Sequence, residues 1–182
     1  MDNTPDTSER PTARLLHRLA RFLLIAGIVV ALDQATKAVI RGWLHPGERW
    51  PADAELLVFS HVHNTGAAFG ILQGAGTFLV IATLITIGAI TFYLLTLPAH
   101  SKFYPLALSL ILGGAIGNLI DRVRLGYVTD FIDPTHYPAF NLADSAIVIG
   151  IIAVAILSFF EQEDPSAEPA REGAREPTEA SS

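Results

Sequence analysis

Residues 113–145 read GGAIGNLIDRVRLGYVTDFIDPTHYPAFNLADS, and this stretch decides the fold because it joins two apolar segments through a polar one. It leaves the first apolar segment at Asp121, passes Asp130 and Asp133, and enters the second with Asn141 and Asp144. Carboxylates at the mouth of a membrane bundle are costly and are therefore usually functional. The stretch thus predicts a functional cluster of acids where two membrane helices meet a loop.

The composition of the 182-residue chain favours a membrane protein. Hydrophobic residues make up 51% of it and the mean hydropathy is +0.41, above the usual values for a soluble domain. The net charge of −6 arises mostly in residues 161–182, which hold seven acids and two arginines and have a disordered composition. There is no cysteine, so thiol catalysis, disulfides and cysteine metal sites are excluded.

Four apolar segments predict membrane-spanning helices at about residues 19–41, 71–97, 103–121 and 141–160. The second has no charge over 27 residues, which exceeds the ~20 residues needed to cross a bilayer. Residues 22–32 alone could form the core of a signal peptide, but no cleavage signal follows and more spans come later. We therefore expect a mainly α four-helix transmembrane bundle at 19–160, between a polar tail at 1–18 and a disordered acidic tail at 161–182.

Four spans place both termini on one side of the membrane and both polar excursions, residues 41–70 and 122–140, on the other. Leaving out the two arginines of the tail at 161–182, lysines and arginines number five on each side, so their count alone does not set the orientation. The four arginines that precede the first span favour a cytoplasmic N-terminus. The same topology brings separate polar residues to one membrane face, namely Asp33, Asn64, Asn118, Asp121, Asp130 and Asp144.

Residues of the first span and of the first excursion have both functional and structural interpretations. Asp33 and Lys37 stand four residues apart on one helical face, either as a site-shaping pair or as a mutually neutralising pair. Asn64 and Gly66 end the first excursion, where the small residue permits close approach of another chain. A plain turn before the next helix explains Asn64 and Gly66 equally well.

The third span ends in a small-residue face and several polar groups. Gly113 and Gly117 predict close helix packing. Asn118 needs a partner inside an apolar helix, which makes it a candidate site residue. Asp121 and Arg122 are further candidates, with an interfacial ion pair between them as the structural alternative.

Asp130 and Asp144 are the candidate catalytic pair. Asn141 and Asp144 also fit a helix start, with Asn141 as the cap and Asp144 in the first turn. Asp130 stands between apolar residues and should have a raised pKa unless it is paired. If the two carboxyl groups approach each other, one proton is shared, and the pair can act as acid and base on a water and a peptide carbonyl.

Other chemistries are poorly supplied by the sequence. His61 and His63 share a strand face but lack a clear third ligand for zinc, so no metal site is expected. Neither a nucleic-acid patch nor a cofactor loop is apparent. A transporter or proton-conducting protein would require polar groups at mid-membrane depth, and a non-enzymatic assembly protein would not require both aspartates.

The assembled motifs resemble lipoprotein signal peptidase (signal peptidase II), a family of bacterial aspartyl membrane peptidases. The resemblance covers about residues 20–160 and rests on DQATK at 33–37, NTGAAF at 64–69, GGAIGNLIDR at 113–122, VTDFID at 128–133 and FNLADS at 140–145. It implies that Asp130 and Asp144 form the catalytic dyad. It also implies a supporting set that shapes the site and holds substrate, namely Asp33, Lys37, Asn64, Gly66, Asn118, Asp121, Arg122 and Asn141.

The same resemblance implies the substrate and the location. Prolipoprotein signal peptides would be cut just before a diacylglyceryl-modified cysteine, without a cofactor, and globomycin-type cyclic peptides would inhibit the reaction. The protein would be a monomer in the bacterial inner membrane, in contact with lipid, with cytoplasmic termini and a periplasmic active site. We further expect a β-cradle from the first excursion and a mobile loop from the second.

Overall fold

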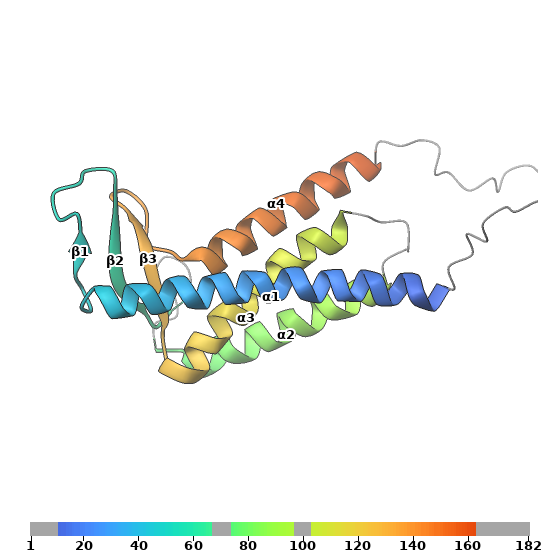
Figure 1. Cartoon of the computed structure of the whole chain (residues 1–182), viewed down its shortest axis with the longest axis horizontal. Helices are drawn as coiled ribbons and strands as arrows, with labels where there is room; N and C mark the ends of the chain where they lie inside the picture. Colours follow the sequence, from blue (N-terminus) through green and yellow to red (C-terminus); the bar gives the residue numbers. More distant parts are fainter. Residues whose placement is uncertain (1–10, 67–73, 97–102, 163–182) are drawn as a thin grey trace, which may run out of the picture.

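Four helices form one bundle with a small sheet at one end (Figure 1). The computed structural model describes residues 11–66, 74–96 and 103–162. The described ends of α1 and α4 that face the chain termini lie at the end of the bundle away from the sheet. The elements in chain order are α1 (Pro11–Trp43), β1 (Arg49–Trp50), β2 (Leu57–Asn64), α2 (Gly76–Thr96), α3 (Tyr104–Leu125), β3 (Val128–Pro134) and α4 (Leu142–Gln162).

All four helices are long and apolar enough to cross a membrane, which confirms the predicted fold class. Their bounds differ from the predicted spans. The first helix begins at Pro11 rather than near residue 19, because proline suits a first helical turn and Ala, Arg and Leu continue it well. The third helix runs beyond residue 121 to Leu125, and Gly126 ends it in a left-handed conformation with φ 81°.

The second helix also starts later than predicted. It begins at Gly76 rather than at residue 71, two residues after Gly74 at φ +81°. Residues 71–73 and 97 of the predicted span lie outside the described part of the chain. The predicted disordered tail at 161–182 lies outside it as well, apart from the last turn of α4.

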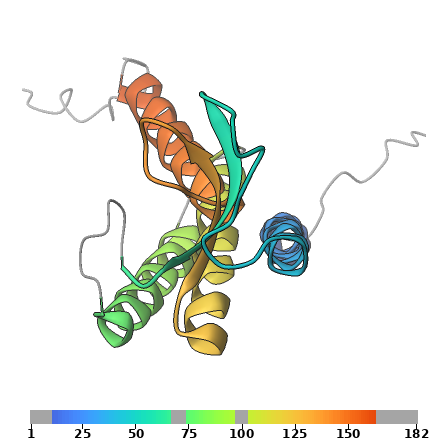
Figure 2. The ribbon, with the colours of Figure 1, turned by 90° about the vertical axis from the view of Figure 1, so that its left-hand side faces the viewer.

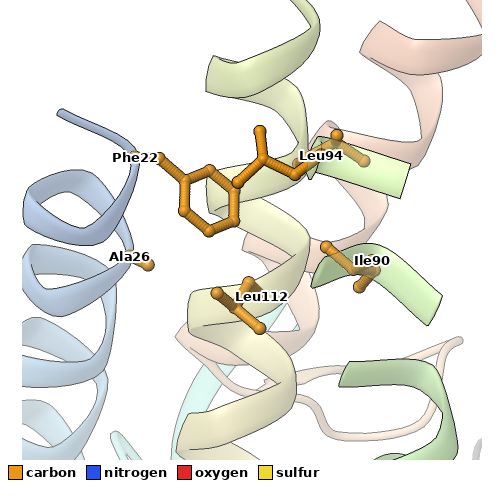
Figure 3. Packing of buried hydrophobic residues seen from close by; sticks show 6 residues of the cluster. Phe22, Ala26, Ile90, Leu94 and Leu112 are labelled. Atoms are coloured by element: carbon orange, nitrogen blue, oxygen red, sulfur yellow. The ribbon is translucent and has the colours of Figure 1, made fainter. Parts of the chain in front are cut away.

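The helix α3 is the centre of the bundle, with α1, α2 and α4 placed around it (Figure 2). Its contacts with α1 and α2 build an apolar core at the end away from the sheet. Phe22 and Ala26 of α1 meet Ile90 and Leu94 of α2 there, with Leu112 of α3 between them (Figure 3). The apolar core therefore leaves the sheet end of the bundle to polar side chains.

Glycines let the helices approach α3 closely. A Cβ atom at Gly113 would lie 2.7 Å from the Cβ of Val29 in α1, and one at Gly114 would collide with the main-chain oxygen of Ala143 in α4. A Cβ atom at Gly117 would lie 2.6 Å from a carboxylate oxygen of Asp33. The close packing predicted from the small-residue face is thus confirmed. It brings polar residues of α1, α3 and α4 close together.

The sheet has the strand order β1-β2-β3, and both pairings are antiparallel. The β-prone run of the first excursion forms β2, as predicted. The second excursion, expected to form a loop, contributes β3 as the third strand. The register shifts between the pairs Phe59–Ile132 and Val62–Asp130, so β2 holds one extra residue. Such a bulge bends a strand and redirects its side chains.

Candidate active site

The two candidate catalytic carboxylates come from different elements at the sheet end of the bundle. Asp130 lies in β3 and is 1% exposed, whereas Asp144 lies half-buried in the first turn of α4. Both oxygens of Asp130 accept hydrogen bonds from side-chain amides. Asn64 Nδ2 donates to Oδ2 at 2.9 Å, and Asn141 Nδ2 donates to Oδ1 at 2.6 Å.

Asn141 connects the two carboxylates because it also caps α4. The main-chain N–H of Asp144 donates to Asn141 Oδ1 at 3.0 Å, and the main-chain N–H of Asn141 donates to Asp144 Oδ2 at 3.2 Å. This reciprocal pair is a capping box. The predicted cap is therefore present, and the amide left over from capping binds Asp130. A structural role for Asp144 does not exclude a chemical one, since its Oδ1 takes no part in the cap and accepts a hydrogen bond from Asn118.

The position of β3 next to α4 follows from a short return of the chain. Phe140 pairs with Ile132, donating its N–H to the Ile132 oxygen at 2.9 Å and accepting from the Ile132 N–H at 2.8 Å. The chain thus turns back beside β3 and enters α4 at once. Asn141 and Asp144 are thereby delivered to the side of Asp130.

The charge of Asp130 is held in an unfavourable environment. Burial, followed by the nearby charge of Asp144, raises the pKa of Asp130 to about 7. The hydrogen bonds from Asn64 and Asn141 and the charge of Lys37 act in the opposite direction but do not cancel the rise. Near neutral pH the site therefore holds a carboxyl group that can give up or take up a proton.

A buried lysine lies behind the carboxylates. Lys37 is 0% exposed and its ammonium contacts Asp33 Oδ2 at 3.0 Å and Asp121 Oδ2 at 3.3 Å. It also donates to Asn118 Oδ1 at 2.9 Å, and Asn118 Nδ2 donates to Asp144 Oδ1 at 2.7 Å. The amide of Asn118 thus has a partner on both sides, as its place in an apolar helix required. Asn118 therefore links the ammonium of Lys37 to the carboxylate of Asp144 through two hydrogen bonds.

Asp33 and Asp121 each tie a second element to this lysine. Asp33 Oδ1 accepts the main-chain N–H of Ala143 at 3.0 Å, so α1 holds the start of α4. Asp121 Oδ2 accepts the main-chain N–H of Thr129 at 3.0 Å, so α3 holds β3. The ion pairs of Asp121 are with Lys37 and Arg41 of α1, whereas Arg122 interacts with Asp121 only electrostatically.

The remaining candidates form one side of the site. Gly66 donates its N–H to Asn64 Oδ1 at 2.9 Å, which orients the Asn64 amide toward Asp130. Arg122 Nη2 donates to the main-chain oxygen of Gly66 at 3.2 Å, and Arg122 interacts electrostatically with Asp144 and Asp130. Asn64 and Gly66 are therefore more than a plain turn. Residues 67–69 of the same motif lie outside the described residues.

Three polar residues of the cluster are absent from the sequence-based set. Gln34 Nε2 donates to Asp33, Asp121 and the oxygen of Gly117 at 3.1–3.2 Å, and Thr129 is fully buried. Arg41 contacts Asp121 and Thr129. Arg41 continues the four-residue spacing of Asp33 and Lys37, which is a signal that the sequence contains.

Metal binding finds no support among the residues that the structure describes, since they hold no group of three or more His, Cys, Asp or Glu that could ligate an ion. His61 is buried and its Nδ1 lies 2.8 Å from the oxygen of Leu44. His63 stacks on Tyr127 with ring centroids 3.7 Å apart. The two imidazoles are thus occupied by packing.

The bundle of apolar helices and the carboxylates at its sheet end define a class: multi-pass membrane peptidases of the aspartic type. Sequence comparison identifies the family within that class. The profile described as Signal peptidase (SPase) II matches residues 25–160, well over half of the chain. The chain therefore belongs to the signal peptidase II family, and the transporter interpretation loses its support.

Relatives and solved structures agree with this assignment. The lipoprotein signal peptidase of Caldanaerobacter subterraneus subsp. tengcongensis is 44% identical over 140 residues, which cover 76% of this chain and 96% of the relative. That of Moorella thermoacetica is 46% identical over 132 residues, covering 72% and 87%. A bacterial membrane enzyme solved by the in meso method at 2.3 Å has a TM-score of 0.74 at 34% identity, covering 87% of this chain and 94% of the other.

Proposed function

We propose that this protein is an aspartic endopeptidase that removes signal peptides from prolipoproteins by cutting just before a diacylglyceryl-modified cysteine. The names of the relatives support a role in lipoprotein processing. One observation carries the chemistry: Asp130 and Asp144 share the side chain of Asn141, and burial with the charge of Asp144 raises the pKa of Asp130 to about 7. Asp130 and Asp144 are the proposed dyad.

In the proposed reaction the two carboxyl groups share one proton and hold a water between them. One carboxylate removes a proton from the water as it attacks the peptide carbonyl, and the other carboxyl group protonates the carbonyl oxygen. Proton transfer to the leaving amine then completes cleavage. Side-chain amides hold both carboxyl groups. Asn64 and Asn141 donate hydrogen bonds to Asp130, and Asn118 donates one to Asp144.

The supporting residues fix this geometry rather than react. Lys37 neutralises carboxylates that would otherwise add to the negative charge of the dyad. Arg122 and Gly66 contact each other beside the dyad, where their polar groups can bind substrate backbone. Asp33 and Asp121 anchor α4 and β3, the elements that carry the two catalytic groups.

The membrane location suits a lipidated substrate. A signal segment is itself an apolar helix, and an acylated cysteine brings further apolar surface, so both should reach the site through the lipid. The large apolar side chains of α2 and α4 are exposed on the bundle and offer a lipid-compatible surface. We place the protein in the inner membrane as a monomer, with the sheet on the periplasmic side and the termini in the cytoplasm.

The decisive experiment is processing by purified protein in lipid. Asp130→Asn and Asp144→Asn should each lower the rate of prolipoprotein cleavage by about 10³-fold, because general acid or base catalysis is lost. Asp133→Asn is the matched control, since Asp133 lies in the same strand but pairs with the half-exposed Arg49 at 3.2 Å. It should cleave at the wild-type rate.

A lipidated substrate, an unlipidated one and globomycin complete the design. Cleavage should require the diacylglyceryl group and should be blocked by globomycin. Membrane insertion and thermal unfolding of each variant separate loss of chemistry from loss of folding. Wild-type processing by either dyad variant would remove the two-aspartate mechanism.

A further inference from the structure

Arg41 reaches β3 from the last turn of α1. Its Nη1 donates to the hydroxyl oxygen of Thr129 at 3.0 Å and lies 3.7 Å from Asp121 Oδ1. The side chain is 24% exposed, so its charge is only partly screened by solvent. Arg41 is thus the outermost of three charged residues spaced four apart on one face of α1, after Asp33 and Lys37.

Thr129 is the residue directly before Asp130, and both its main-chain N–H and its hydroxyl group form hydrogen bonds. Asp121 accepts its main-chain N–H at 3.0 Å, and Arg41 donates to its hydroxyl group. Thr129 is 0% exposed, so neither group has water as an alternative partner. The position of Asp130 along β3 therefore depends on Arg41 and Asp121 together.

Arg41 adds a second positive charge close to the two acids behind the dyad. Asp33 and Asp121 carry two negative charges, and Lys37 between them supplies one positive charge. Arg122 also interacts electrostatically with Asp121, but Arg41 is an ion-pair partner of Asp121, so its loss leaves this buried cluster more negative, which is costly. The second oxygen of Asp121 is the one that Arg41 approaches.

Other charged and titratable groups also face this region. Asp130 interacts with Asp144 of α4, Lys37 of α1 and Arg122 of α3. From β2, His63 pairs with Thr129 in the sheet and packs against His61. Burial and the charge of His61 lower the pKa of His63, so it is neutral at neutral and alkaline pH. In that range His63 adds no charge, and the group near Arg41 that changes its protonation is Asp130.

We propose that Arg41 is a positioning residue of the peptidase: it holds Thr129 in place and supplies the positive charge that balances Asp121, and so sets the pH range in which the neighbouring dyad works. The inference rests on the proposed function of Asp130 and Asp144. Loss of the Arg41 charge leaves the cluster more negative, which favours the proton-bearing form of Asp130. The alkaline limb of the activity profile then moves to higher pH.

The test is the pH profile of kcat/KM for a lipidated substrate, followed at neutral and alkaline pH in low salt. Arg41→Gln, which keeps a donor for Thr129 but removes the charge, should move the alkaline limb upward by about one pH unit. Arg41→Lys keeps the charge and should leave the limb at its wild-type pH. Thr129→Val removes the hydroxyl acceptor but no charge and should also leave the limb in place.

Arg49→Gln is the control for the substitution itself. Arg49 lies in the same sheet, is half-exposed and pairs with Asp133 away from the dyad, so its profile should match the wild type. A profile of Arg41→Gln that coincides with those of Arg41→Lys and the wild type overturns the inference. If the wild-type protein itself does not cleave the substrate, the proposed function fails instead, and the two failures are therefore distinct.

A second variant keeps the inference testable if Arg41→Gln does not fold. The chain contains no cysteine, so Arg41→Cys offers a single thiol for modification. A neutral methyl thiosulfonate and a positively charged aminoethyl thiosulfonate then give two forms of one preparation. The charged form should have its alkaline limb about one pH unit below the neutral form. Identical profiles overturn the inference.

Discussion

At the scale of the residue, the environment that suits Asp130 for proton transfer also lowers the stability of the folded protein when Asp130 is ionised. Its carboxyl group is buried beside another carboxyl group, and these two causes raise the pKa of Asp130 to about 7. The folded protein therefore binds more protons than the unfolded chain between the ordinary aspartate pKa and about 7. Stability contributed by this group is lost as the pH rises through that window, and the loss is complete above it.

Asp130→Asn should therefore stabilise the protein at alkaline pH. The neutral amide removes the buried charge but loses one of the two amide hydrogen bonds that Asp130 accepts, which costs about 1 kcal/mol. We expect a Tm near or below the wild type at about pH 5 and above it at about pH 8, by about 1–3 kcal/mol in free energy. Thermal unfolding in detergent across this pH range measures the difference. A constant Tm offset would contradict a raised pKa.

Single residues also show what the sequence could and could not predict. The contact of Asp33 with Lys37 and the cap at Asn141 follow from spacings of four and three residues along one helix. The contact between Arg41 and Thr129 joins positions 88 residues apart, and no local spacing encodes it. The pairing of Lys37 with Asp33 was predictable, but its further contacts with Asp121 and Asn118 were not, because both of these residues lie on α3.

At the scale of the element, the start of α4 depends on how closely α3 approaches it. Gly114 faces the main-chain oxygen of Ala143, which immediately precedes Asp144. A side chain at position 114 cannot be accommodated by rotation of a neighbouring side chain alone, since main-chain atoms are in the way. The distance between the two helices therefore controls the position of Asp144, a member of the proposed dyad.

Gly114→Ala should push the first turn of α4 away from α3. We expect a loss of about 1–3 kcal/mol in stability and a fall in kcat that exceeds any rise in KM. Gly88→Ala in α2 is the matched control, because a Cβ atom at Gly88 meets nothing within 4 Å. Measured Tm and cleavage rates that are equal for the two variants would show that this contact has no role in placing Asp144.

Elements were predictable where hydrophobicity alone defines them. The four helices and the strand β2 follow from apolar runs and β-prone composition. The third strand was missed, because β3 lies in an excursion whose pairing with β2 depends on residues about 70 positions away. Helix ends were set by single glycines and a proline, which periodicity does not resolve.

At the scale of the whole molecule, the bundle is divided by polarity along its length. The apolar core around Phe22 and Leu94 occupies one end, and the buried ion cluster around Lys37 occupies the other, next to the sheet. Described ends of α1 and α4 lead away from the sheet (Figure 1). In a bilayer this arrangement places the chemistry at one surface, where water can reach it.

Orientation can be tested with single cysteines, since the natural chain has none. Asp53→Cys, at an exposed position between β1 and β2, should react with a membrane-impermeant maleimide added to intact cells with a permeable outer envelope. Ser182→Cys in the C-terminal tail should react only after lysis. The reverse labelling pattern would place the sheet in the cytoplasm and contradict the proposed topology.

The hydrogen bond from Ala143 to Asp33 has a consequence for synthesis of the protein. It joins positions 110 residues apart, so Asp33 Oδ1 gains this partner only after the last helix has been made. A chain with only its first three helices inserted would have Asp33 and Lys37 in the bilayer but would lack Ala143 and Asp144, which both belong to the last helix. The proposed dyad is therefore incomplete until that helix has been made.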